Sequence, residues 1–142
     1  MTVVSDNSLF NQYSTQFLRG MSERMRDSCT SSQLNEFLKE RFTFFREAIR
    51  RSGMVRVRKH KISQFSLTEK NHNRCVIVEI VSPDAPFIVV TVEALMRQLD
   101  LLILCKLHPI IGVDLTEGKE VEKVFLPQKD LEKYDHLYLE VK

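Results

Sequence analysis

The chain of 142 residues has few of the residues that mark common catalytic and cofactor sites. Its four glycines are isolated at positions 20, 53, 112 and 118, so the dinucleotide-binding pattern G-x-G-x-x-G does not occur. Three cysteines without a C-x-x-C pair argue against a disulfide framework and favour a reducing, cytoplasmic setting. The four histidines form no H-E-x-x-H motif and no short metal-binding pair. We therefore predict no catalytic, cofactor-binding or metal-binding residue in this chain.

Long hydrophobic runs are also missing. The longest apolar stretch, near Leu99–Leu107, is interrupted by Asp100 and Lys106 and is too short to span a bilayer. The first residues contain no basic segment followed by an apolar one, so we expect no secretory signal. The net charge is only +2, while 43% of the residues are hydrophobic, enough to bury a core. We expect a folded domain that does not enter a membrane.

Two helices are predicted in the first third of the chain. Over Asn7–Met25, apolar residues recur every three or four positions, which indicates one amphipathic helix. A second helix should run from Thr30 to about Arg51, because Thr30 and Gln33 can form a capping box at its start. Gly53 is placed to end it. We assign residues 1–53 to a helical extension.

Strands dominate the rest. A third helix, predicted to end near Leu99, should start with Pro86 in its first turn and Asp84 as its cap. Met54–Arg58 alternates apolar and basic residues, as a half-exposed strand does. The other predicted strands are Arg74–Val81, Leu101–Leu107, Ile110–Leu115, Glu120–Leu126 and His136–Val141.

The order strand, polar turn, helix, strand opens a ferredoxin-like βαββαβ unit. We therefore predict an α+β fold in residues 54–142, with an antiparallel sheet preceded by two helices. A complete unit needs a further helix and a fourth strand, yet the last predicted strand ends at the end of the chain. Either Met54–Arg58 takes the missing edge position, or the chain is a fragment of a longer protein that lacks its last helix and strand. We favour the fragment.

The segment at residues 79–92, EIVSPDAPFIVVTV, resembles the N-terminal region of the large bacterial NAD-specific glutamate dehydrogenases. Arg51–Val57 resembles an upstream part of the same family, and the resemblance covers roughly Leu34 to Lys142. The residues that follow the family's pattern in order and spacing are Asp84, Pro86, Phe87, Val89, Val92, His108 and Pro109.

This resemblance implies an ACT-like domain with a regulatory or assembly role. The full-length enzyme would deaminate L-glutamate oxidatively to 2-oxoglutarate with NAD, and its catalytic and cofactor residues would lie outside this chain. As partners, the resemblance implies self-association, docking to other domains of the enzyme, or an amino-acid effector. Ligand-binding ACT domains usually carry glycine after the proline of the loop before the helix, where Phe87 stands here. This departure favours docking over effector binding.

One loop is the best candidate site for an effector or an interface. It consists of Ser82, Pro83, Asp84, Ala85, Pro86 and Phe87. Free N–H groups at a helix start attract a carboxylate, as an amino-acid effector would supply. The alternative is a self-capped turn in which Asp84 occupies those donors. His108 and Pro109, between two strands, are interpreted as a structural break or bulge.

Two other functions remain open from the residues. The first is a free-standing amino-acid-sensing module. The second is nucleic-acid binding by the basic cluster at residues 50–61, whose cations could neutralise phosphates. Against the second, Val76–Val81 and Leu101–Leu107 contain no aromatic residue on which a base could stack. A solvated basic edge that prevents aggregation is the simpler explanation of the cluster.

Overall fold

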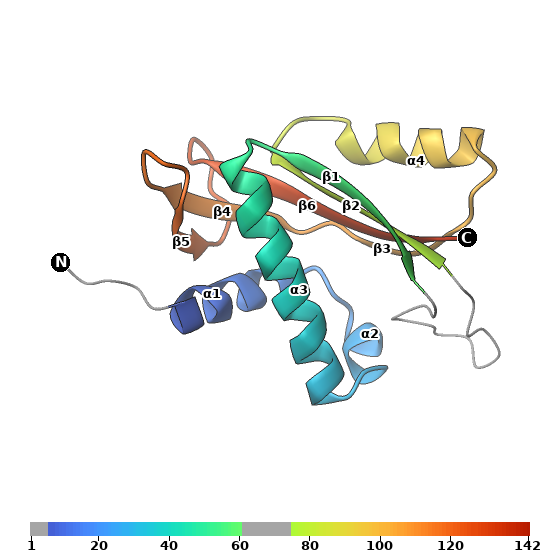
Figure 1. The fold of residues 1–142 in the computed structure, drawn as a ribbon, viewed down its shortest axis with the longest axis horizontal. Coiled ribbons are helices and arrows are strands. Elements are labelled where there is room, and N and C mark those ends of the chain that lie inside the picture. Colours follow the sequence, from blue (N-terminus) through green and yellow to red (C-terminus); the bar gives the residue numbers. More distant parts are fainter. Residues whose placement is uncertain (1–5, 61–74) are drawn as a thin grey trace.

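The computed structural model describes residues 6–60 and 75–142 of the chain, which fold into three layers around a single sheet (Figure 1). The elements are α1 (Asp6–Leu18), α2 (Glu23–Asp27), α3 (Ser31–Arg50), β1 (Met54–His60), β2 (Cys75–Pro83), α4 (Ile88–Gln98), β3 (Ile103–Leu107), β4 (Ile110–Leu115), β5 (Val121–Phe125) and β6 (Lys133–Val141).

The strands form an antiparallel sheet in the order β1-β2-β6-β4-β5, with β3 also paired to β6. β3 and β4 lie end to end along β6, with Leu107 opposite Tyr138 and Ile110 opposite Asp135. The predicted break at His108 and Pro109 separates these two strands. Since β2 and β3 both run antiparallel to β6, the unit β2-α4-β3 is a split βαβ with β6 inserted. The α+β, ferredoxin-like prediction is confirmed.

β1 occupies the edge of the sheet beside β2, with Met54 opposite Val81 and His60 opposite Cys75. β1 therefore takes the edge position that the fourth strand of a complete unit would occupy, as in the first of the two explanations given above. That the chain is a fragment stays a prediction.

Helices cover both faces of the sheet. Neighbouring residues of a strand point to opposite faces of the sheet. On β2, Ile77 and Val81 therefore belong to a larger core with residues of α1 and α3, and Val78 belongs to a smaller core with α4. Figure 1 shows α1 and α3 on one side of the sheet and α4 on the other. Tyr13 and Phe45 are fully buried in the larger core, so the N-terminal helices and the sheet share one hydrophobic interior. The domain division at residues 53 and 54 stays a prediction.

The start and end of α3 follow from local sequence. The Thr30 hydroxyl accepts from the backbone N–H of Gln33 at 3.1 Å, and the Gln33 side chain accepts from the N–H of Thr30 at 2.9 Å. The predicted capping box is confirmed. Gly53 follows the last turn with a φ of 128°, which side-chain-bearing residues rarely adopt, and its N–H reaches the carbonyl of Ala48 at 2.8 Å.

The first predicted helix is wrong in one respect: Asn7–Met25 is not continuous. α1 ends at Leu18, and α2 begins after Ser22, whose hydroxyl accepts from the backbone N–H of Met25 at 3.2 Å. Gly20 lies in the turn between them. Phe17 before the turn and Met21 after it both face the core, four positions apart, as in a continuous helix. The periodicity of apolar residues therefore could not reveal the turn between α1 and α2.

β6 is the central strand and the most deeply buried one. It begins at Lys133, three residues before the predicted His136, and all its residues from Tyr134 to Val141 are buried. A hairpin turn joins β4 to β5, and its residue with positive φ is Lys119 (60°) and not Gly118.

Candidate functional site

The candidate loop at residues 82–87 joins β2 to α4. Ser82 and Pro83 are the last residues of β2, and the N–H of Asp84 bonds to the carbonyl of Lys133 at 3.0 Å. α4 begins at Ile88 with Phe87 as its N-cap residue, at a φ of 69° and without a side-chain capping bond. The predicted cap at Asp84 and the placement of Pro86 in the first helical turn are therefore wrong.

Asp135, on β6, ties the loop to the break between β3 and β4. One of its carboxylate oxygens accepts from the N–H of Ala85 at 3.3 Å, and the other lies 3.0 Å from Nε2 of His108. The carbonyl of Pro109 accepts from the N–H of His136 at 3.0 Å. The predicted loop and the His-Pro break thus meet around a buried carboxylate that sequence reasoning missed. Asp135 belongs to no motif, and only its position within a buried strand could have drawn attention to it.

A cavity of about 350 Å³ lies against this junction, lined by residues of the loop, the start of α4, and Lys106, His108 and Asp135. Partial burial raises the pKa of Asp84, and the neighbouring carboxylate of Asp135 raises it further. The cavity therefore places carboxylates and potential cations within one small space.

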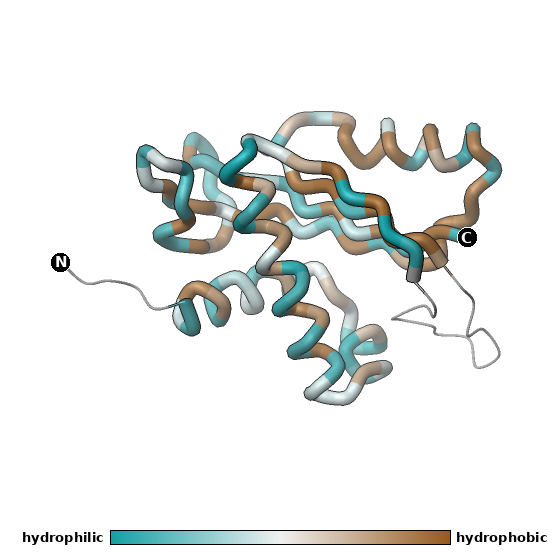
Figure 2. The backbone as a smooth tube through the Cα atoms, viewed as in Figure 1, coloured by the Kyte–Doolittle hydropathy of each residue, from teal (hydrophilic) through white to brown (hydrophobic). Residues whose placement is uncertain are grey.

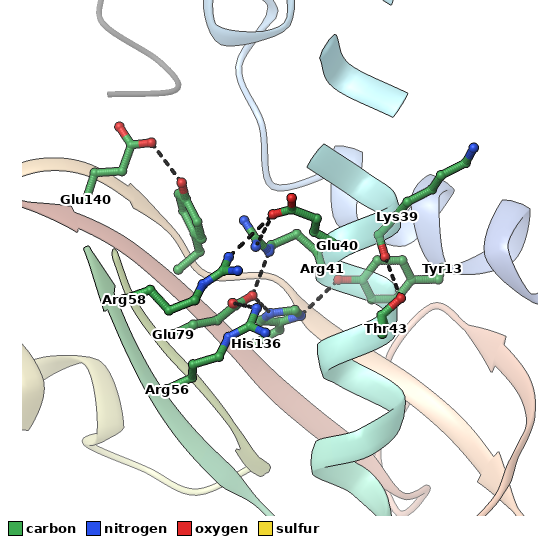
Figure 3. Close-up of polar contacts among 11 residues, drawn as sticks. Tyr13, Lys39, Glu40, Arg41, Thr43, Arg56, Arg58, Glu79, His136 and Glu140 are labelled. Atoms are coloured by element: carbon green, nitrogen blue, oxygen red, sulfur yellow. Dashed lines mark hydrogen bonds and ion pairs between the residues drawn. The ribbon is translucent and has the colours of Figure 1, made fainter. Parts of the chain in front are cut away.

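A second polar cluster is buried between the sheet and the N-terminal helices (Figure 3). Glu79 lies at its centre and is fully buried. One Glu79 oxygen is 2.7 Å from Nη2 of Arg56; the other is 2.7 Å from Nε of Arg41 and 2.6 Å from Nε2 of His136. Nδ1 of His136 is 2.9 Å from the hydroxyl of Tyr13. These five side chains come from α1, α3, β1, β2 and β6, and sequence reasoning singled out none of them for this role.

The protonation of the cluster follows from its surroundings. Burial acts to raise the pKa of Glu79, but the hydrogen bonds from His136 and Arg56 and the charge of Arg41 outweigh it and lower the pKa. Burial lowers the pKa of His136, although Glu79 opposes the change. His136 is therefore neutral, donates from Nε2 to the Glu79 carboxylate, and accepts at Nδ1 from the hydroxyl of Tyr13.

The basic cluster at residues 50–61 is largely neutralised by this packing. Arg50 makes a two-pronged bond to Glu120 at 2.7 and 2.9 Å, and Arg58 lies 3.4 Å from Glu40. Arg56 lies over the ring of Phe44, 4.3 Å from its centroid, while its guanidinium pairs with Glu79. Lys61 lies outside the described residues. The expectation of a solvated basic edge is wrong for Arg56.

β1 exposes its apolar side chains and partly buries a charged one, which is the reverse of a usual half-exposed strand. Val55 and Val57 are each 63% exposed, whereas the side chain of Arg56 between them is only 27% exposed. The valines point away from the larger core, toward the side of the sheet that carries α4. Figure 2 shows hydrophobic colour on the strands beneath α4 as well as on the helix itself.

An apolar slot results, bounded by α4 on one side and floored by β1 and β2. It has a volume of about 1080 Å³. Val57 and Val78 are cross-strand partners on its floor, and Leu95 and Leu99 form its wall on α4, respectively 47% and 57% exposed.

Comparison with known proteins shows the family to which the chain belongs. The family model described as "Glutamate dehydrogenase, ACT1 domain" matches residues 13–142. The chain belongs to this family. No curated protein and no solved structure matched.

The ACT1 match reaches further toward the N-terminus than the resemblance noted from Leu34 onward. It begins at Tyr13, the α1 residue whose hydroxyl bonds to His136. The matched region therefore contains the whole Glu79 cluster as well as the loop at residues 82–87 and the slot. α1 and α3 contribute to the interior of the ACT1 domain itself.

Other groups in the ACT1 domain have structural surroundings. Cys75 and Cys105 are buried and free, and burial raises the pKa of the Cys75 thiol to about 11. Within residues 6–60 and 75–142, no three His, Cys, Asp or Glu side chains are arranged to hold a metal ion. The helices in these two ranges include none long and apolar enough to cross a membrane.

Proposed function

We propose that this chain is the N-terminal regulatory and assembly domain of an NAD-specific glutamate dehydrogenase, which oxidatively deaminates L-glutamate to 2-oxoglutarate in the cytoplasm. The observation that carries the proposal is the ACT1 family match over residues 13–142. The domain would act by contact, either with a second copy or with other domains of the enzyme. Its exposed apolar slot supports this role, because a soluble domain rarely leaves such a surface uncovered.

The residues of the chain do not fit an NAD site. A dinucleotide is usually held where a glycine-rich turn leads from a strand of a parallel sheet into a helix. Here the strand pairings are antiparallel, and the turn into α4 carries Pro86 and Phe87 instead of glycine. We therefore assign hydride transfer and NAD binding to a part of the enzyme outside this chain.

The test compares the dehydrogenase carrying this domain with a version lacking residues 1–142. We expect the deletion to lower the mass of the assembly, measured by light scattering, or to change the response of the activity to effectors. An enzyme whose assembly and kinetics are both unchanged by the deletion would contradict the proposal. Addition of residues 1–142 as a separate chain is the control, and should restore part of what was lost.

A second candidate function is amino-acid sensing at the loop of residues 82–87. The cavity there has the carboxylates of Asp84 and Asp135 for an ammonium group. Lys106 and His108 would have to exchange their pairs with Glu93 and Asp135 to hold a carboxylate. The N-cap residue Phe87 makes no side-chain capping bond at the start of α4, which supports this function over a self-capped turn. Calorimetric titration of residues 1–142 with the common amino acids tests this function. A heat of binding that disappears in the Asp84→Asn variant would support amino-acid sensing. The absence of any heat of binding at millimolar ligand would eliminate it.

A further inference from the structure

The floor of the slot beside α4 consists of two strands, β1 and β2. Adjacent strands are about 4.8 Å apart, so a pair of strands offers a floor close to the roughly 10 Å diameter of a helix with its side chains. α4 itself packs over the inner edge of this floor, because Met96 shares a small core with Val78 of β2 and Leu139 of β6. The part of the chain that the structure describes places no second helix on this face. A helix lying beside α4 would cover Val55 and Val57.

The inverted alternation of β1 indicates that the slot is covered in the functional state. If the valines of β1 faced solvent permanently, the strand would expose its apolar side and bury its charged one. The ion pair between Arg56 and Glu79 holds the strand in this register, because a shift by one residue would move every side chain to the other face. The slot, with a volume of about 1080 Å³, is as large as the largest small-molecule pockets, which reach roughly 1,000 Å³.

Charge at one end of the slot points to the chemistry and direction of its occupant. Its lining is apolar except for Lys59 and Lys142. Both lie at the end where α4 terminates, since Lys59 pairs with Val76 and Lys142 bonds to Leu102 through the backbone. Neither lysine forms an ion pair with the described residues. Acidic side chains favour the first turn of a helix, whose N-terminus is positive.

We infer that the slot receives an amphipathic α-helix of about three turns, running antiparallel to α4, with acidic residues in its first turn beside Lys59 and Lys142. The helix is contributed by another part of the same dehydrogenase. The inference rests on the proposed function and deepens it, because it names the surface and the partner chemistry through which the domain docks.

The test uses residues 1–142 and a labelled synthetic helix of about 14 residues (~21 Å), stapled on its polar face because short helices are marginal in water. The probe carries a leucine stripe and two glutamates in its first turn. A control peptide of the same composition has the glutamates in its last turn. Fluorescence anisotropy should show saturable 1:1 binding of the probe, and at least fivefold weaker binding of the control peptide.

Four variants locate the binding site on the domain. Val57→Asp and Leu99→Lys, at exposed positions in the slot, should each weaken the probe at least tenfold while keeping the circular dichroism spectrum. Val90→Asp is the matched control: Val90 is also 63% exposed, but it lies outside the slot. It should bind normally. The double reversal Lys59→Glu, Lys142→Glu should invert the preference between the two peptides.

Other outcomes overturn the inference. Self-association that Val57→Asp abolishes would show that a second copy covers the slot. Binding of a long-chain fatty acid in the absence of any peptide binding would make it a lipid site. If neither peptide binds, while residues 1–142 still restore assembly of the deleted enzyme, the inference fails and the proposed function stands.

Discussion

The carboxylate of Glu79 accepts a hydrogen bond from Nε2 of His136 across 2.6 Å, with both side chains fully buried. Two strands and two helices converge on this contact, because Tyr13 reaches His136 from α1 and Arg41 reaches Glu79 from α3. The cluster therefore fastens the N-terminal helices to the sheet. A buried charge is tolerated only when it is paired and hydrogen-bonded, so the loss of one member leaves the others unsatisfied.

Glu79→Gln should destabilise the fold strongly. The substitution keeps the shape of the side chain but leaves the buried Arg41 and the half-buried Arg56 without their counter-charge. Breaking a buried ion pair from one side costs about 3–5 kcal/mol. Urea denaturation followed by circular dichroism measures the change. Glu120→Gln, which removes the exposed pair with Arg50, is the control and should leave the midpoint nearly unchanged. Equal effects of the two substitutions would contradict the role assigned to Glu79.

The stability of the domain should fall as the pH is lowered from 7 to 5. Burial lowers the pKa of His136 in the folded state, so near pH 6 the unfolded chain binds a proton that the folded chain does not. Stability then rises with pH, by at most about 1.4 kcal/mol per pH unit for one group. The lowered pKa of Glu79 acts in the same direction at lower pH, below its unfolded value.

The contribution of His136 can be isolated by His136→Asn, whose amide keeps a polar group beside Tyr13 but does not titrate. Urea midpoints between pH 5 and 7 should be less pH-dependent in this variant than in the parent chain. The other histidines are common to both chains and cancel in the comparison. Parallel pH profiles would show that folding does not lower the pKa of His136.

Features that depend on neighbouring residues could be predicted from the sequence. The capping box of Thr30 and Gln33, the stop at Gly53 and the break at His108 and Pro109 each involve a few consecutive residues whose backbone chemistry is restrictive. The order of strands and helix around residues 75–115 was predictable for the same reason, because apolar periodicity and turn residues are local signals.

The Glu79 cluster and the slot could not be predicted in this way. Tyr13 and His136 are 123 positions apart, and Glu79 is a single polar residue within an apolar strand. On β1, the pattern predicts valines inside and arginines outside, but the carboxylate of Glu79 on the neighbouring strand draws Arg56 inward and turns the valines out. The register of one strand against another decided which residues became the exposed site.

Gly112→Ala should destabilise the hairpin of β4 and β5. A Cβ at Gly112 would lie 2.6 Å from ring atoms of Phe125 and 3.0 Å from its carbonyl oxygen, so the aromatic ring must move. Overpacking of this kind costs about 1–3 kcal/mol. Gly118→Ala is the matched control, because its nearest contact is the Thr116 hydroxyl at 3.9 Å. In thermal unfolding, the melting temperature of Gly112→Ala should be clearly lower than that of Gly118→Ala. Equal melting temperatures would argue against the close contact with Phe125.

Phe87→Asn should stabilise the domain. Phe87 has a φ of 69° and is 75% exposed, so its backbone is in the left-handed region without a compensating burial of the ring. A bulky residue there costs about 1–2 kcal/mol, whereas asparagine tolerates this conformation through local hydrogen bonds. Phe87→Ala keeps most of the backbone penalty and should gain less. Urea denaturation of both variants measures the difference. A loss of stability in Phe87→Asn would mean that the aromatic ring contributes contacts which outweigh the strain.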